Sequence, residues 1–179
     1  MKFYIVSDDY IQYLQKVDNK VRENKTTRPY IGVVLEINNN QFLAPLTSYK
    51  EKHDRIPEQS PLIFKMYDLD DTKVSLGMVQ LNNMIPICES EVSLLDLSSQ
   101  SDDYQVLVNK QQKFLRKNKS ELKKKALKLY KIIAGGHAKR LVEMSCDFKS
   151  LETAKAAFEP AEQRKPTQEK LEELENAFK

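Results

Sequence analysis

The sequence contains no tryptophan and only four glycines, two histidines and two cysteines among its 179 residues. Cys88 and Cys146 lack the short spacing of a metal-binding pair, and two cysteines are too few for a disulfide framework. We therefore expect two reduced thiols. The sequence predicts neither a bound metal nor a cofactor.

The chain also lacks any apolar run long enough to span a bilayer. Its apolar start, residues 1–6, turns polar at Ser7, too early for the apolar region of a signal peptide. With 40% hydrophobic and 31% charged residues, the composition is typical of a globular protein. We expect one domain of ordinary size, located in the cytoplasm and not bound to a membrane.

The positive charge is concentrated in one segment, although the net charge of the whole chain is only +3. Residues 110–140 carry twelve Lys or Arg against one acid, Glu121, so this segment is +11 and the remainder is −8. Exposed helices usually mix both signs, so the bias indicates a surface that binds a polyanion. A membrane surface is another possible partner for a basic amphipathic helix.

The first half of the chain shows the pattern of an antiparallel sheet. Short runs rich in β-branched and aromatic residues predict strands at 3–6, 62–67, 76–80 and 84–87. Residues 30–37 and 41–46 flank three asparagines that suit a tight turn, which predicts a β-hairpin. We expect a short helix after Ser7, a polar surface loop at 18–28, and a turn at Asp68–Lys73 rather than a calcium loop.

The second half changes to a helical period. Apolar residues recur at helical spacing from about 104 to 133, and Ser120 is a candidate N-cap that would divide this stretch into two helices. Gly135-Gly136 ends it, and a further helix is expected from 149 to 158. The sequence thus predicts an α+β fold, in which a compact, curved antiparallel sheet or small barrel precedes a helical part. Residues 1–158 form the predicted domain, and residues 159–179 a tail with a possible short helix.

The most reactive stretch directly follows the second strand of the hairpin. Residues 47–53, Thr-Ser-Tyr-Lys-Glu-Lys-His, bring together hydroxyls, lysines and a histidine. Cleavage of RNA without a metal needs proton transfer and positive charge at the phosphorus, and these side chains supply both. An ordinary polar loop has the same composition. The residues alone therefore leave open an endoribonuclease, a non-catalytic RNA-binding module, and a peripheral membrane or protein-interaction module.

An ordered set of short matches resembles the ToxN/AbiQ family of toxins over residues 1 to about 158. The matching positions are 1–4, 10, 13–14, 30–37, 43–48, 50, 84–87, 91–97, 111, 114, 116 and 146–149. The resemblance implies a Kid/MazF-like curved sheet decorated by helices. It also implies a type III toxin–antitoxin system, in which a toxin cuts RNA to 2′,3′-cyclic phosphate and 5′-hydroxyl ends.

The same resemblance implies the partners. The toxin would cleave cellular and phage mRNA and its own repetitive antitoxin precursor, and the processed pseudoknot RNA would inhibit it. Toxin and RNA would alternate in a closed ring.

Site residues follow from the resemblance position by position. It implies catalytic groups at Thr47, Ser48, Lys50, Arg28 and Tyr10, with His53 as a candidate general acid. Arg28 departs from the lysine common in relatives, so we assign it charge stabilisation rather than proton transfer. The predicted RNA-binding residues are Tyr30, Tyr49, Lys52, Lys110, Gln111, Arg116 and Lys117.

Overall fold

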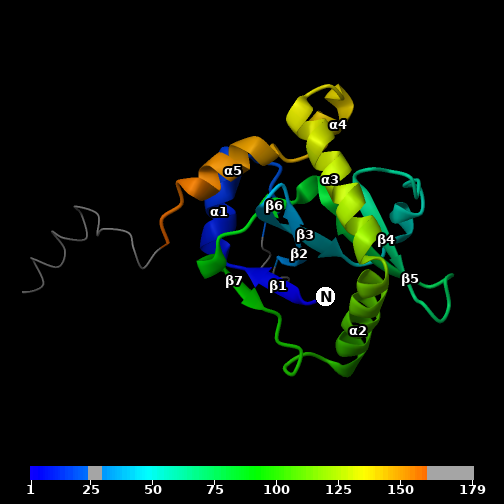
Figure 1. Ribbon diagram of the computed structural model, residues 1–179. Coiled ribbons are helices and arrows are strands. Elements are labelled where there is room, and N and C mark those ends of the chain that lie inside the picture. The colour runs from blue at the N-terminus through cyan, green and yellow to red at the C-terminus, as the bar shows by residue number, and fades with distance from the viewer. Residues whose placement is uncertain (24–29, 161–179) are drawn as a thin grey trace, which may run out of the picture.

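The computed structural model describes residues 1–23 and 30–160, and Figure 1 shows a central sheet with helices around it. The strands are β1 (Phe3–Val6), β2 (Ile31–Ile37), β3 (Asn40–Thr47), β4 (Ile63–Tyr67), β5 (Ser75–Gln80), β6 (Ile85–Pro86) and β7 (Val92–Leu94). The α-helices are α1 (Asp8–Val17), α2 (Asp102–Lys117), α3 (Lys119–Gly135), α4 (Lys139–Glu143) and α5 (Phe148–Ala156). Three short 3₁₀ helices are η1 (Glu51–His53), η2 (Leu81–Asn83) and η3 (Glu89–Glu91).

The sheet is antiparallel throughout, with the strand order β4-β5-β3-β2-β1-β7 and with β6 paired to β3. The predicted hairpin is confirmed as β2–β3. Its turn places Asn38 and Asn39 at φ 49° and 62°, the left-handed region that asparagine tolerates better than most residues. Among the described strands β4 and β7 are the two ends of the order and do not pair, so the sheet stays open. The curved sheet is therefore confirmed, and its form is not a closed barrel.

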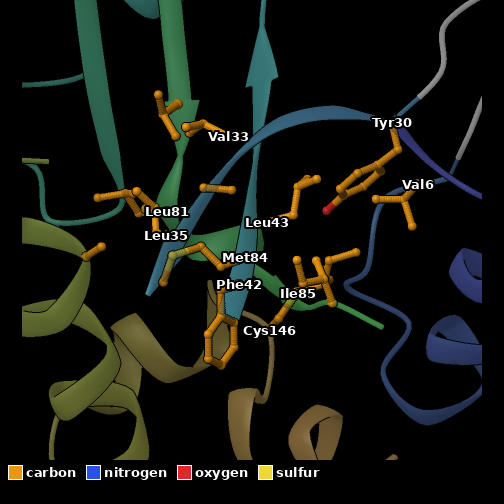
Figure 2. Packing of buried hydrophobic residues seen from close by; sticks show 14 of the residues in the cluster. Val6, Tyr30, Val33, Leu35, Phe42, Leu43, Leu81, Met84, Ile85 and Cys146 are labelled. Atoms are coloured by element: carbon orange, nitrogen blue, oxygen red, sulfur yellow. The ribbon is translucent and has the colours of Figure 1, made fainter. Parts of the chain in front are cut away.

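The helices cover the sheet in two groups. At one end α1 and α5 pack side by side, where the Tyr13 hydroxyl donates to the Ala154 carbonyl at 2.9 Å (Figure 1). At the other end α2 packs on β4 and β5, and α3 packs on β2. Buried apolar side chains fill the space between, among them Leu35, Phe42 and Met84, which Figure 2 shows in one cluster. The packing fixes the position of β3, the strand that leads into the reactive stretch.

Most predicted elements are confirmed, and the differences concern one helix cap, one loop and two short elements. The helical stretch does divide in two, but the N-cap of α3 is Asn118 rather than Ser120. Asp18 and Val21 are buried, so the start of the predicted surface loop is packed against the fold. The sequence analysis did not predict α4 or β7, which are only five and three residues long.

Two predictions fall on residues outside the described part of the chain. These are Arg28, and the tail beyond residue 160. Within the described ranges, none of the helices combines the length and apolar character needed to cross a membrane.

Candidate active site

The end of β3 carries the first two candidate catalytic residues. Thr47 is the last residue of the strand and pairs with Met78 of β5, and exposed Ser48 follows it. Gly77 on β5 lets the two strands lie this close. A Cβ added to Gly77 would lie 2.3 Å from the Thr47 carbonyl oxygen, and its φ of +103° suits glycine alone. The position of Thr47 and Ser48 thus depends on a glycine of the neighbouring strand.

The next turn joins Lys50 to His53. The backbone N–H of His53 donates to the Lys50 carbonyl at 2.8 Å, and the Lys50 N–H donates to His53 Nδ1 at 3.1 Å. Because Nδ1 accepts a hydrogen bond, the proton of the neutral ring lies on Nε2. Burial, followed by the charges of Lys52 and Lys50, lowers the pKa of His53 below 6.5. The imidazole is therefore neutral at pH 7 and presents Nε2–H as a donor.

Tyr49 and Lys52 project from the same turn into solvent. The Tyr49 ring is 41% exposed, and its hydroxyl donates to Asp54 Oδ2 at 2.6 Å. That hydrogen bond is the main cause that raises the pKa of Tyr49 above 10. Both residues lie at the surface beside Lys50, where contact with RNA is possible.

A groove of about 910 Å³ opens beside Thr47 and Ser48. We call it the hydroxyl groove because five of its lining residues are alcohols, namely Thr47, Ser48, Ser93, Ser99 and Ser101. The apolar part of its lining comes from β1, β2, β3, α2 and the end of β7, and Asp96 is the single charged residue in that lining. An almost uncharged groove of this size has room for the ribose and base of a nucleotide.

A second groove, of about 660 Å³, lies on the side of the turn that carries Lys52 and His53. We call it the cationic groove because four exposed cations line it, namely Arg22, Lys52, Arg55 and Arg140. The reactive turn thus separates an almost uncharged groove from a strongly positive one.

Three predicted site residues are buried and hold the fold together. The Tyr10 hydroxyl donates to the Pro86 carbonyl at 2.9 Å, and the Tyr30 hydroxyl donates to the Asn83 carbonyl at 2.9 Å. Burial raises the pKa of both hydroxyls, and the catalytic role of Tyr10 stays a prediction. Gln111 donates from Nε2 to the Leu76 carbonyl at 2.7 Å and so ties α2 to β5. It also lines the hydroxyl groove.

The basic segment is less uniform than the sequence suggests. Lys110 forms a 2.6 Å ion pair with Asp68, whose side chain is 7% exposed, and Lys113 lies 3.9 Å from Asp70. The hydrogen bond from Lys110 is the first cause that lowers the pKa of Asp68. Lys110 therefore anchors α2 to the turn between β4 and β5, and its charge is already neutralised.

Other cations of the segment stay exposed at the junction of α2 and α3. Arg116 and Lys117 are in the last turn of α2, and Lys119 begins α3. Burial lowers the pKa of the Met1 amino group, and the charges of Arg116, Lys119 and Lys2 lower it further. We call Lys2, Arg116, Lys117 and Lys119 the junction cluster.

The structure adds residues that sequence reasoning missed. Gly77 supports the end of β3, and Asn83 and Arg22 join Arg140 of the predicted basic segment in the lining of the cationic groove. The residues of β5 give no local sign that Gly77 has a left-handed φ. The groove residues are brought together by tertiary contacts, which the sequence does not reveal. Among the described residues no group of three or more His, Cys, Asp or Glu could hold a metal, and the absence of a metal stays a prediction.

Comparison with known proteins identifies relatives along nearly the whole chain. A family model described as toxin ToxN of a type III toxin–antitoxin system matches residues 2–156. The endoribonuclease ToxN of Pectobacterium atrosepticum is 37% identical over 158 residues, which covers 85% of this chain and 90% of that protein. The endoribonuclease AbiQ of Lactococcus lactis subsp. lactis is 31% identical over 165 residues and covers 88% of each chain.

Solved structures agree with these sequence matches. One comes from work on a processed non-coding RNA that regulates a bacterial antiviral system. It has a TM-score of 0.81 and 35% identity, with 89% of this chain and 100% of the other covered. A second, from work on selective toxin inhibition by a non-coding RNA pseudoknot, has a TM-score of 0.74 and 32% identity, with 87% and 96% covered. The resemblance found in the sequence is thus confirmed, and the chain belongs to the ToxN family of type III toxin–antitoxin toxins.

Proposed function

We propose that this chain is the endoribonuclease toxin of a type III toxin–antitoxin system and cleaves RNA in a sequence-specific, metal-independent reaction. The observation that carries the proposal is the convergence at the end of β3. Thr47 and Ser48 line the hydroxyl groove there, while Lys50 and His53 form the turn beside it. Curated relatives with the same fold are named endoribonucleases.

The proposed reaction is an in-line transesterification. The 2′-oxygen of the ribose attacks the adjacent phosphorus, and the bond from phosphorus to the 5′-oxygen breaks. The proton lost from the 2′-hydroxyl is balanced by one delivered to the 5′-oxygen, which leaves a 2′,3′-cyclic phosphate and a 5′-hydroxyl. Negative charge grows on the phosphoryl oxygens along this path, and we assign its stabilisation to the Lys50 ammonium. The hydroxyls of Thr47 and Ser48 orient the attacking ribose and do not form a covalent bond to phosphorus.

The hydrogen bond between the Lys50 N–H and His53 Nδ1 favours an uncharged imidazole. Protonation at Nδ1 would place two donors face to face, because the Lys50 N–H already points at that atom. We therefore propose that the imidazole of His53 stays neutral in the reaction and that its Nε2–H donates a hydrogen bond to a phosphoryl or leaving oxygen. This donor role replaces the role of general acid that the resemblance alone implied for His53. Tyr10, Tyr30 and Gln111 are assigned to positioning, because each is buried and bound to a backbone carbonyl.

The inhibitor that we propose is a pseudoknot RNA, processed by this enzyme from a repetitive precursor. A solved relative comes from work on inhibition by such an RNA. In a closed ring of alternating toxin and RNA, each toxin needs two RNA-binding surfaces. The cationic groove and the junction cluster are two such surfaces on different parts of the fold. Each attracts phosphates strongly enough that binding falls as salt rises.

Cellular and phage mRNA are the proposed targets of the free toxin, in the cytoplasm where those RNAs are found. A similar structure comes from work on a bacterial antiviral system. We further propose that residues 1–158 are the catalytic domain and that residues 159–179 are an appended tail.

The test is cleavage of a mixed RNA in the presence of EDTA. Wild type should cleave it, and Lys50→Ala should not, although its circular dichroism spectrum and melting temperature stay those of wild type. Lys128→Ala is the matched control, because Lys128 is also an exposed lysine but lies on α3, outside the reactive turn. Full activity of Lys50→Ala would exclude this active site. Loss of wild-type cleavage in EDTA would exclude a metal-independent reaction.

A further inference from the structure

The row of paired residues that begins at Thr47 carries a lysine two strands away. Thr47 of β3 pairs with Met78 of β5, and Met78 pairs in turn with Lys65 of β4. Residues paired in this way across an antiparallel sheet point to the same face. Neighbouring strands lie roughly 5 Å apart, so the Cα atoms of Thr47 and Lys65 are about 10 Å apart. The register therefore places Lys65 on the same face of the sheet as Thr47.

A small hollow joins Lys65 to the reactive turn. The turn lines it with Tyr49, His53 and Asp54, and the sheet lines it with residues that include Lys65, Tyr67 and Met78. Its volume is about 20 Å³, which is room for a single water-sized group and far too little for a nucleotide. The hollow can therefore take one oxygen atom of a phosphate that lies outside it.

The ammonium of Lys65 has no partner, although the residue is partly buried. Within residues 1–23 and 30–160 it forms no ion pair and no hydrogen bond. Asp54 accepts instead from the Tyr49 hydroxyl at 2.6 Å. In the same way, Glu58 accepts from the Tyr67 hydroxyl at 2.8 Å. A partly buried cation without a counter-ion costs free energy, and a bound anion would offset that cost.

The charge around the His53 ring is positive overall. Burial is the largest cause that lowers the pKa of His53, the charges of Lys52, Lys50 and Lys65 lower it further, and the charge of Asp54 raises it. Three cations against one carboxylate attract an anion to this ring. Lys65 differs from the other two cations because it belongs to the sheet rather than to the turn.

We propose that Lys65 is a second catalytic cation, whose ammonium binds one phosphoryl oxygen of the scissile phosphate together with the His53 ring. Lys50 contacts that phosphate from the turn and Lys65 contacts it from the sheet, so the growing negative charge has a cation on two sides. Lys65 stays protonated and transfers no proton. This assignment rests on the proposed nuclease function and adds to it a residue from outside the reactive stretch.

The test compares Lys65→Met with Lys73→Met. Methionine keeps an unbranched side chain and removes the charge, and Lys73 is an exposed lysine in the turn between β4 and β5. On an RNA that wild type cuts, Lys65→Met should lower the single-turnover rate about 100-fold, and Lys73→Met should leave it unchanged. Affinity for the same RNA with a 2′-deoxyribose at the cut site should fall by about fivefold or less, the effect of one exposed ion pair.

Two checks separate the charge from the fold. Circular dichroism should show each variant folded at the temperature of the assay. Lys65→Arg keeps the charge and should cleave faster than Lys65→Met, and equal rates of these two variants would refute a role for the charge.

A second measurement needs no cleavage. The chain has two histidines, so NMR can follow the ring signals of His53 and His137 separately while inorganic phosphate is added. The His53 signal should shift saturably in wild type and in Lys73→Met, and this binding should be at least about fivefold weaker in Lys65→Met. His137 is exposed and lies outside the reactive turn, so it is the internal control.

Several results would overturn the assignment. Equal cleavage rates of Lys65→Met and Lys73→Met would exclude Lys65 from the reaction. A loss of affinity as large as the loss of rate would mean that Lys65 only holds the RNA and does not act on the reacting phosphate. His53 shifts that are absent, or that Lys65→Met leaves unchanged, would exclude the anion site. Cleavage of RNA with a failed phosphate titration refutes Lys65 alone, and phosphate binding without cleavage refutes the nuclease alone.

Discussion

Replacing Gly77 by alanine tests whether the end of β3 is the active site. The structure predicts two separate costs. The φ of +103° is one that alanine rarely adopts, and the new Cβ would lie 2.3 Å from the Thr47 carbonyl oxygen. That atom belongs to backbone, so the strain cannot be relieved by a side-chain rotation. The end of β3 has to move away from β5, and Thr47 and Ser48 move with it.

The expected loss of stability is the sum of these two costs. The unfavourable φ costs about 1–3 kcal/mol, and the steric conflict in a packed region adds roughly 1–3 kcal/mol. We therefore expect the free energy of unfolding to fall by about 2–6 kcal/mol. A displacement of about 1 Å at catalytic groups can lower the rate roughly 100-fold. The loss of cleavage should thus persist at temperatures where the variant is fully folded.

Gly136→Ala is the control. Gly136 also has a left-handed φ, +68°, but a Cβ there meets nothing within 4 Å. We expect a loss of about 1–2 kcal/mol from the backbone conformation alone, with unchanged cleavage. Urea denaturation gives the stabilities, and initial cleavage rates of the folded proteins give the activities. A folded Gly77→Ala protein with wild-type activity would refute the reasoning.

Three further predictions concern single groups. Cleavage should fall as the pH drops through the pKa of His53, which lies below 6.5, because protonation of Nδ1 breaks its hydrogen bond with the Lys50 N–H. His53→Gln should remove this step from the pH–rate profile. Tyr30→Phe should lower the free energy of unfolding by about 1–2 kcal/mol by leaving the buried Asn83 carbonyl without its donor, while RNA affinity in a filter-binding assay stays unchanged. The pKa of Asp68 is lowered from 3.8, so its ion pair with Lys110 stabilises the fold above pH 3.8 and is lost as the pH falls through the lowered pKa. Lys110→Met should flatten acid denaturation curves below pH 4 and barely alter RNA binding.

Local sequence pattern was sufficient for the regular elements. The alternation in β2 and β3, with asparagines between them, predicts the hairpin because the turn chemistry and the side-chain period agree. The same holds for α1 and for the division into α2 and α3. By contrast, α4 and β7 are too short to show a period, and tertiary contacts decide them. One example is β7, which forms by pairing with β1, a strand from the start of the chain.

The part of the candidate site that consists of consecutive residues could be predicted from the sequence. The contacts between distant residues could not. Thr47 to His53 are consecutive, so their chemistry was visible in the sequence. The sequence predicts a catalytic Tyr10 and RNA contacts for Tyr30 and Gln111. In the structure each of the three bonds to a carbonyl 35 or more residues away. No local signal reports such a partner. For the same reason the basic segment did not reveal that Asp68 neutralises Lys110.

The most direct test of the central claim is the chemistry of the cleaved bond. An RNA that wild type cuts at a mapped position is synthesised again with a single 2′-deoxyribose on the 5′ side of that bond, and both are incubated in EDTA. The account predicts cyclic phosphate and 5′-hydroxyl ends from the all-ribose RNA, no cut at the deoxy position, and no cut of either RNA by Lys50→Ala. Cleavage at the deoxy position, or products with a 5′-phosphate, would contradict it.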